Sequence, residues 1–219
     1  MTARGVFITV EGVEGVGKTT NLSFMRDWLN NAGIDLVCTR EPGGTPLAEE
    51  LRALLLANRD ESVDPHAELL MVFAARAQHL SQIIEPALKQ GKWVLCDRFT
   101  DATFAYQGGG RKLPEDVIAT LEHLVQRGRH PDRTFYLDLD VDIGLARAHG
   151  RGEADRFERE QREFFEAVRS AYWRRVRENP ARFSVIDAGA SLAEVQARIA
   201  IELTDLLTRH RQLSNGAGQ

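Results

Sequence analysis

Eight residues near the amino terminus have the types and the spacing needed to bind a chain of phosphates. They match the pattern Gly-x-x-x-x-Gly-Lys-Thr, in which glycines let backbone N–H groups turn toward phosphate oxygens. The lysine reaches the β and γ phosphates, and the threonine hydroxyl is placed to bind Mg²⁺. The sequence therefore predicts a triphosphate site made by Gly12, Val13, Glu14, Gly15, Val16, Gly17, Lys18 and Thr19.

A second pair of residues favours phosphoryl transfer over hydrolysis. The apolar run 93–96 ends in Asp97, whose carboxylate suits Mg²⁺ or its waters, and Arg98 follows directly. A hydrolytic ATPase usually has a glutamate at that point to activate water, and a GTPase has an Asn-Lys-x-Asp sequence that this chain lacks. Because a cation stands in place of the base, the pattern favours transfer to a second phosphate.

Three further groups of residues have an ordinary structural interpretation, and the first two of them also suit ligand binding. Arg40 ends a strand and precedes Glu-Pro-Gly-Gly-Thr, so it is either a salt-bridged turn residue or part of an anion site. Phe73 and Arg76 share a helix face, which suits core packing as well as contact with a planar base. Tyr106 and Gln107 precede three glycines, which is typical of a flexible surface loop.

Residues 147–162 alternate arginines with acidic side chains. One interpretation is a solvated, salt-bridged helix start, which we expect for Arg159 and Arg162. The other is a lid, because the glycines on both sides of Arg151 would let the segment close over a nucleotide. The candidate lid residues are therefore Arg151 first, then Arg147 and Arg156.

Strands and helices alternate along the chain and place these residues in one α/β domain. Continuous apolar strands between helices are typical of a mainly parallel sheet that is covered on both faces. We expect a P-loop NTPase three-layer sandwich with a five-stranded sheet. The predicted strands are 6–10, 36–39, 93–96, 134–137 and 183–186, and the predicted helices are 19–31, 46–57, 66–89, 115–126, 164–176 and 192–207.

Several boundaries follow from the same patterns. The domain is expected to span 1–211, with 212–219 as a disordered tail. The long helix is expected to break near Pro86, and 107–111 and 147–162 are predicted to be mobile. In the second helix, one apolar face is predicted from Leu47, Leu51, Leu54 and Leu55.

Composition and charge exclude several classes of protein. The 219 residues include 28 basic and 32 acidic side chains, a net charge of −4, which provides no basic surface for duplex DNA. No apolar run approaches the roughly 20 residues that cross a membrane. Cys38 and Cys96 form no pair motif and are expected to be reduced, buried thiols. We therefore expect a cytoplasmic protein with no nucleic-acid or membrane partner.

Six motifs in order give the chain a specific resemblance to the bacterial thymidylate kinases (dTMP kinases), a family of nucleoside monophosphate kinases. The resemblance implies Mg²⁺-dependent transfer of the γ-phosphate of ATP to dTMP, giving ADP and dTDP for dTTP biosynthesis. It also implies a homodimer. The motifs occupy residues 11–20, 39–45, 73–76, 97–99, 105–110 and 151–156.

The resemblance assigns roles in the acceptor site. Arg40 and Arg98 would bind the dTMP phosphate, Phe73 would stack on thymine, and Arg76 would donate to a thymine carbonyl oxygen. Phe99 stands where the family usually has Tyr or His. The remaining acceptor contacts would come from Glu14 at the 3′-hydroxyl, Tyr106 near the 2′ position and Gln107 at the base.

The catalytic set follows from the charge that must be neutralised. The acceptor is a phosphate that is already ionised at pH 7, so no strong general base is needed. Lys18, Arg98 and Arg151 would stabilise the transferring group, and Thr19 and Asp97 would hold Mg²⁺. Two alternatives remain at this point: a kinase for another acceptor, such as dUMP or a deoxynucleoside, and a non-catalytic nucleotide-dependent switch protein.

Overall fold

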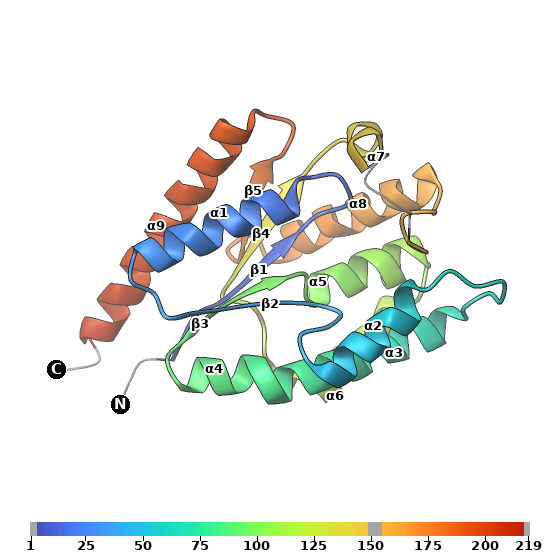
Figure 1. Ribbon diagram of the computed structural model, residues 1–219, viewed down its shortest axis with the longest axis horizontal. Helices are drawn as coiled ribbons and strands as arrows, with labels where there is room; N and C mark the ends of the chain where they lie inside the picture. Colours follow the sequence, from blue (N-terminus) through green and yellow to red (C-terminus); the bar gives the residue numbers. More distant parts are fainter. Residues whose placement is uncertain (1–3, 149–154, 217–219) are drawn as a thin grey trace.

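Five short strands form one sheet in which every neighbouring pair is parallel. The computed structural model describes residues 4–148 and 155–216. The strand order β2-β3-β1-β4-β5 places the carboxyl ends of all strands along one edge of the sheet (Figure 1). The α/β prediction is thereby confirmed. The strands are β1 (Phe7–Glu11), β2 (Leu36–Arg40), β3 (Trp93–Asp97), β4 (Arg133–Asp138) and β5 (Phe183–Asp187).

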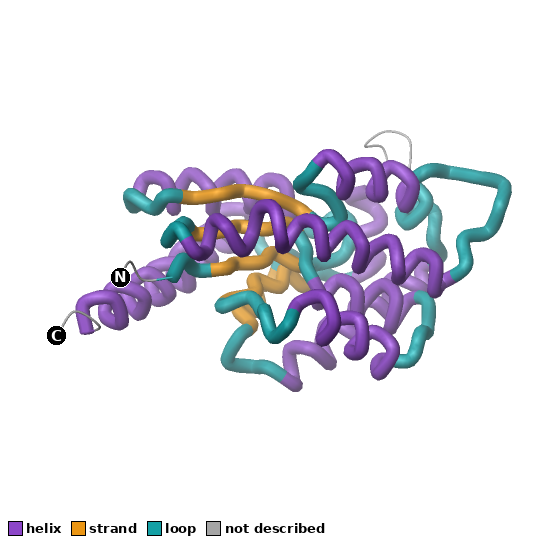
Figure 2. Tube along the Cα trace, turned by 90° about the horizontal axis from the view of Figure 1, so that it is seen from below, coloured by secondary structure: helices purple, strands orange, loops and turns teal. Residues whose placement is uncertain are grey.

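Helices cover both faces of the sheet, which gives the expected three layers (Figure 2). On β1, Ile8 belongs to one core with buried residues of α1 and α9, whereas Phe7 packs with residues of α4 and β3 on the other side. This alternation follows from the two-residue period of a strand. The helices are α1 (Lys18–Asn31), α2 (Pro46–Leu56), α3 (Pro65–His79), η1 (Leu80–Ile84), α4 (Glu85–Lys89), α5 (Thr100–Thr103), η2 (Phe104–Gly110), α6 (Glu115–Gln126), α7 (Val141–Ala148), α8 (Arg162–Glu178) and α9 (Leu192–Gly216).

Beyond shifts of one or two residues at several ends, the helices differ from the predictions in three respects. The long helix from 66 to 89 changes to π-helical geometry at 80–84, so the irregularity lies before Pro86, which sits in the first turn of α4. The short helices α5 and α7 were not predicted. Residues 212–216 continue α9, and 217–219 lie outside the described residues. The disordered tail stays a prediction.

The buried face of α2 is only partly the apolar face that the sequence predicted. Ala48 and Leu55 are buried, whereas Leu47 and Leu54 are each 49% exposed. Four leucines outweigh one alanine in any hydrophobic pattern, but the smaller side chain is the one that lets α2 approach its neighbours. The buried face therefore follows positions 48, 52 and 55, and Arg52 falls on it.

Residues 107–110, predicted to be a mobile loop, belong to the helical segment η2, which packs against α8. A Cβ atom added to Gly109 would lie 2.7 Å from the carbonyl oxygen of Ala167, and one added to Gly110 would lie 2.3 Å from the Phe164 ring. These glycines therefore serve close packing of two helices rather than flexibility.

The two cysteines differ in exposure because one lies in an outermost strand of the sheet and the other in an inner strand. Cys96 lies in the inner strand β3 and is buried as predicted, whereas Cys38 lies in the edge strand β2 and is exposed. Both are free thiols.

Both ends of the described chain lie together at the amino end of the sheet (Figures 1 and 2). The ring of His210 in α9 packs edge-on against Trp93 at the start of β3, with 5.2 Å between centroids. No helix among the described residues is both long and apolar enough to span a membrane.

Candidate active site

The loop between β1 and α1 has the backbone geometry that its glycines predict. Gly15 and Gly17 adopt φ values of 77° and 84°, a region in which L side chains are strained. A Cβ on Gly15 would lie 2.0 Å from the carbonyl oxygen of Gly144. The loop ends at the first turn of α1, whose unpaired N–H groups and positive dipole end favour an anion.

Lys18 lies over this loop, where its ammonium group could bind a phosphate. Its Nζ donates to the carbonyl oxygens of Gly12 and Val13, at 3.0 and 3.2 Å. Burial, followed by the nearby Arg98 cation, lowers the pKa of Lys18 to about 8, although Asp97 and Glu14 act in the opposite direction. A lysine held by neutral carbonyls gains most from an arriving anion, because the anion would stabilise its positive charge and raise its pKa again.

Asp97 and Thr19 fit a magnesium ion that arrives with a triphosphate. The buried Oδ1 of Asp97 has no hydrogen-bond partner among the residues that the structure describes. Thr19 lies in the first turn of α1 and lines the same cavity as Asp97. No group of three or more acidic, His or Cys side chains within the described residues could hold a metal. Mg²⁺ commonly takes one or two protein ligands and completes its shell with phosphates and water.

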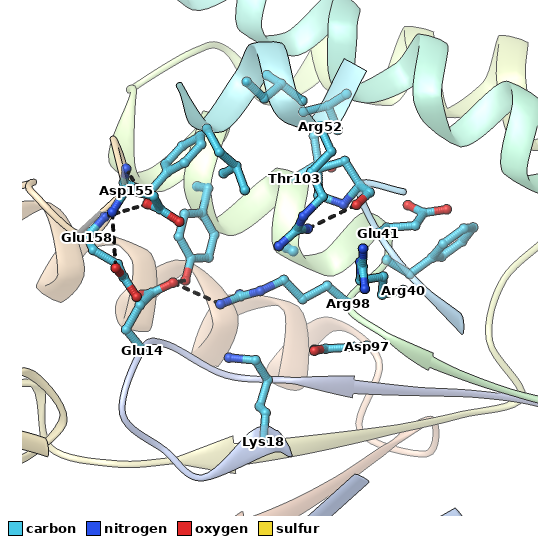
Figure 3. Close-up of a pocket in the computed structure, with 18 of the residues that line it drawn as sticks. Glu14, Lys18, Arg40, Glu41, Arg52, Asp97, Arg98, Thr103, Asp155 and Glu158 are labelled. Carbon is cyan, nitrogen blue, oxygen red and sulfur yellow. Dashed lines mark hydrogen bonds and ion pairs between the residues drawn. The ribbon is translucent and has the colours of Figure 1, made fainter. Parts of the chain in front are cut away.

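A cavity of about 330 Å³ opens beside the phosphate loop. It is bounded by the loop, the carboxyl ends of β2 and β3, and the helical segments α2, α3 and η2 (Figure 3). Its position at the carboxyl edge of a parallel sheet is where α/β folds bind ligands. The predicted residues that line it are Glu14, Gly15, Val16, Gly17, Lys18, Thr19, Arg40, Arg76, Asp97, Arg98, Tyr106 and Gln107.

Three arginines come together at this cavity, and one of them was missed by the sequence analysis. Arg40 pairs with Glu49 at 2.7 Å, and Arg98 extends from the tip of β3. The third is Arg52, whose Nη1 donates to the carbonyl oxygen of Pro42 at 3.0 Å. Burial, and then repulsion from Arg40, lowers the pKa of Arg52. The available signal was its position on the 48/52/55 face of α2.

Arg76 is a buried cation with one nitrogen left over. Its Nε donates to Glu41 at 2.7 Å and its Nη2 donates to Thr103 at 2.9 Å, and the residue is 2% exposed. Nη1 is buried and has no hydrogen-bond partner in the described parts of the chain. Since buried N–H groups normally have an acceptor, this nitrogen marks a place for a polar atom of a ligand.

Phe73 does not line the cavity, so the structure gives no support to its predicted stacking on a base. It is 2% exposed and packs with Leu69, Phe104 and Ile118. The preceding residue, Val72, lines the cavity instead. Positions three and four residues before Arg76 both lie near its helix face, so the spacing alone did not decide which of them meets a ligand.

Glu14, Arg98 and Tyr106 form one hydrogen-bonded group across the cavity (Figure 3). Arg98 Nη2 donates to Glu14 Oε1 at 2.9 Å. The Tyr106 hydroxyl lies 2.8 and 2.9 Å from the two Glu14 oxygens, and the Arg98 guanidinium lies 4.8 Å from the Tyr106 ring centre. The predicted sugar-site and phosphate-site residues are therefore brought together.

Gln107 and Arg156 meet at the fully buried carboxylate of Glu68. Gln107 Nε2 donates to it at 2.8 Å, and Arg156 pairs with it at 2.7 Å. Arg156 Nε also donates to the carbonyl oxygen of Leu55 at 2.9 Å. Arg156 is thus anchored to α2 and α3 rather than placed at the phosphate loop, which differs from its predicted role in nucleotide binding.

The remaining predicted lid residues are only partly described. Arg147 is exposed, and its Nη1 donates to the carbonyl oxygen of Ala188 at 3.0 Å. Arg151 lies outside the described residues.

Comparisons with known proteins find relatives of one family along most of the chain. The profile of the family described as thymidylate kinase matches residues 10–199. A thymidylate kinase of Teredinibacter turnerae is 62% identical over 195 residues, covering 89% of this chain and 95% of that protein. One from Pseudomonas putida is 58% identical over 94% of this chain and 99% of that protein. A crystal structure of thymidylate kinase from Ehrlichia chaffeensis superposes with a TM-score of 0.75 at 35% identity, covering 93% of this chain and 99% of that one.

Proposed function

Because the chain belongs to the thymidylate kinase family and so transfers a phosphoryl group from ATP to dTMP, we propose that the cavity beside its phosphate loop is the dTMP site. The family assignment favours this reaction over the two alternatives, another acceptor and a non-catalytic switch. The observation that carries the proposal is the meeting of three arginines with the buried, unsatisfied Nη1 of Arg76.

The chemistry of the cavity walls suits each part of dTMP. Arg40, Arg52 and Arg98 would bind the phosphate, because guanidinium groups make paired hydrogen bonds to phosphate oxygens. Arg76 Nη1 and Gln107 would meet the base, and the apolar side chains of Leu55, Leu56 and Val72 would pack against it. Glu14 and Tyr106 would contact the sugar.

The donor phosphates would lie on residues 12–19, with Lys18 at the β and γ phosphates. Thr19 and Asp97 would hold Mg²⁺, which neutralises charge on the phosphates when it is bound. Arg147 and Arg151 would act near the donor nucleotide. Arg156 is better explained as an anchor to α2 and α3 than as a nucleotide-binding residue, because it contacts Glu68 and Leu55.

Catalysis would then consist of positioning and charge stabilisation. The acceptor phosphate has a second pKa of about 6, so its oxygen is ready to attack without a base. Lys18, Arg98 and Arg151 would spread their charge over the transferring group during an in-line displacement. This assignment agrees with the cation that follows Asp97 in place of a hydrolytic glutamate.

Replacing Arg40 with alanine is expected to raise the KM for dTMP by about tenfold or more, with a smaller change in kcat, because one charged contact to the ground-state phosphate is lost. Steady-state kinetics with dTMP varied at saturating ATP measures both constants. Arg209→Ala is the matched control, since Arg209 is also exposed and ion-paired, with Asp205, but lies on α9. An unaltered KM for dTMP in Arg40→Ala would remove Arg40 from the phosphate site.

We also propose that two copies form a homodimer, as the family resemblance implies, and that α2 and α3 provide its interface. These helices pack side by side and expose Leu47, Leu54 and Leu70, the last at 57%. Exposed leucines on neighbouring helices form the kind of apolar surface that a partner covers.

We further propose that the protein is a cytoplasmic enzyme that works without nucleic-acid or membrane partners. Its net charge of −4 supports the absence of a nucleic-acid partner.

Leu54→Glu is expected to convert the dimer into a monomer, because a charge buried at an apolar interface is strongly unfavourable. Sedimentation velocity measures the change. Leu124→Glu is the control, since Leu124 is even more exposed, at 66%, but belongs to α6 rather than to α2 or α3. A wild-type chain that sediments as a monomer would contradict the proposed pairing.

A further inference from the structure

Arg98 adopts a backbone conformation that needs support from its surroundings. It directly follows β3, and its φ of 67° lies in the left-handed region, which costs energy for a residue with a side chain. This turn aims the guanidinium across the cavity toward Glu14 (Figure 3). The groups that hold the turn therefore decide where a charge-stabilising residue sits.

Two of the contacts of Arg98 belong to the substrate cavity, and one does not. Glu14 and Tyr106 both line the cavity, so an acceptor that engages them competes with Arg98 for their polar atoms. The third contact is the phenol oxygen of Tyr172, which accepts from Arg98 Nη1 at 3.3 Å. Tyr172 is fully buried and is not part of the cavity wall, so a ligand in the cavity would not compete for this contact.

Tyr172 is itself fixed by a buried carboxylate. Its hydroxyl donates to Glu11 Oε2 at 2.8 Å, and the other oxygen of Glu11 accepts from the backbone N–H of Phe99 at 2.7 Å. Phe99 is the next residue after Arg98. Glu11 and Tyr172 thus hold both the turn that follows Arg98 and its guanidinium.

The hydrogen bond from Arg98 to Tyr172 does not depend on whether Glu11 is protonated. Burial, and then the neighbouring Asp101 carboxylate, raises the pKa of Glu11 to about 8, while Arg98, Tyr172 and the Phe99 N–H act in the opposite direction. Arg98 donates to a lone pair of the phenol oxygen. Burial also raises the pKa of Tyr172 well above its ordinary value, so the phenol keeps its proton. Its oxygen still has a lone pair for Arg98 whether Glu11 is ionised or protonated.

We propose that Tyr172 is a positioning residue for phosphoryl transfer. Its hydroxyl lies outside the cavity wall and holds the Arg98 guanidinium where it can contact the transferring phosphate. Because Tyr172 lies on α8, it links that helix to the tip of β3. The inference rests on the role proposed above for Arg98.

Tyr172→Phe removes the hydroxyl and keeps the ring. The expected result is a fall in kcat of about tenfold, the size of a lost hydrogen bond to a charged group, with an unchanged KM for ATP. Tyr136→Phe is the matched control. The two rings stack at 5.0 Å, and Tyr136 is equally buried, but its hydroxyl donates to Asp138 instead. Equal falls in kcat for the two variants would indicate a packing effect and overturn the proposal.

A double-mutant cycle separates positioning from structure. In an Arg98→Ala background, Tyr172→Phe is expected to cause no further loss of kcat, because the group that it positions is gone. A further tenfold loss there would overturn the proposal. If Arg98→Ala lowers kcat but Tyr172→Phe alone does not, the inference on Tyr172 is wrong and the role of Arg98 stands. If Arg98→Ala leaves kcat unchanged, both are wrong.

Discussion

Lys18→Met is expected to lower kcat by about a thousandfold, equivalent to about 4 kcal/mol of transition-state stabilisation. Methionine keeps most of the side-chain length but brings no charge to the β and γ phosphates. The loss is expected to be large because the hydrogen bonds of Lys18 within the described site go to the carbonyl oxygens of Gly12 and Val13. None of the described carboxylates there forms an ion pair with its charge. Rapid-quench or coupled-assay measurement of dTDP formation gives kcat.

Lys92→Met controls for the loss of a lysine in general. Lys92 is partly exposed and pairs with Asp35 at 3.6 Å, away from the phosphate loop, so its variant is expected to retain wild-type kcat. Thermal unfolding of Lys18→Met reports whether the loop has lost stability as well. A variant that folds normally and keeps kcat within threefold would exclude Lys18 from the charge-stabilising set.

Arg151→Ala is expected to reduce kcat by about a thousandfold or more while changing the KM for dTMP little, the pattern of an arginine that acts on the transferring phosphoryl group. The motif at 151–156 and the glycines on both sides of Arg151 support this expectation. The anchoring of Arg156 by Glu68 and Leu55 leaves Arg151 as the better candidate of the two.

Arg162→Ala is the control for charge in this part of the chain. Arg162 pairs with Asp142 at 2.6 Å and with Glu166 at 2.7 Å, so its charge is engaged at the surface and the variant is expected to behave as wild type. An unchanged kcat in Arg151→Ala would refute its assignment to the reaction, and an equal fall in both variants would point to a general electrostatic effect.

The sequence predicted the sheet and the phosphate loop well because their signals are local. A buried parallel strand is a continuous apolar run, and residues 115–126 were predicted with the boundaries that α6 has. The loop at 12–19 combines glycines, lysine and threonine at a fixed spacing, so its geometry needs little help from distant residues. Arg40 and Asp97 could be placed because each ends a strand.

The features that the sequence did not predict depend on packing between distant segments of the chain. Whether Val72 or Phe73 meets the cavity is decided by what lies against α3, not by the helix period. Arg52 was overlooked because Ala48, the small residue on its face, contributes little to a hydrophobic pattern. The glycines after Gln107 were taken for a flexible loop, but their lack of side chains serves the contact with Ala167 and Phe164.

The meeting of both ends of the chain at the amino end of the sheet has a practical consequence. Arg4 and His210 lie within contact of each other, with 3.4 Å between His210 Nε2 and the Arg4 carbonyl oxygen, while the proposed nucleotide sites lie at the carboxyl ends of the strands. An affinity tag or a fluorescent label fused at either end would be attached far from the substrates. The enzyme could be immobilised on a sensor surface through one tag, with its binding face toward the solution.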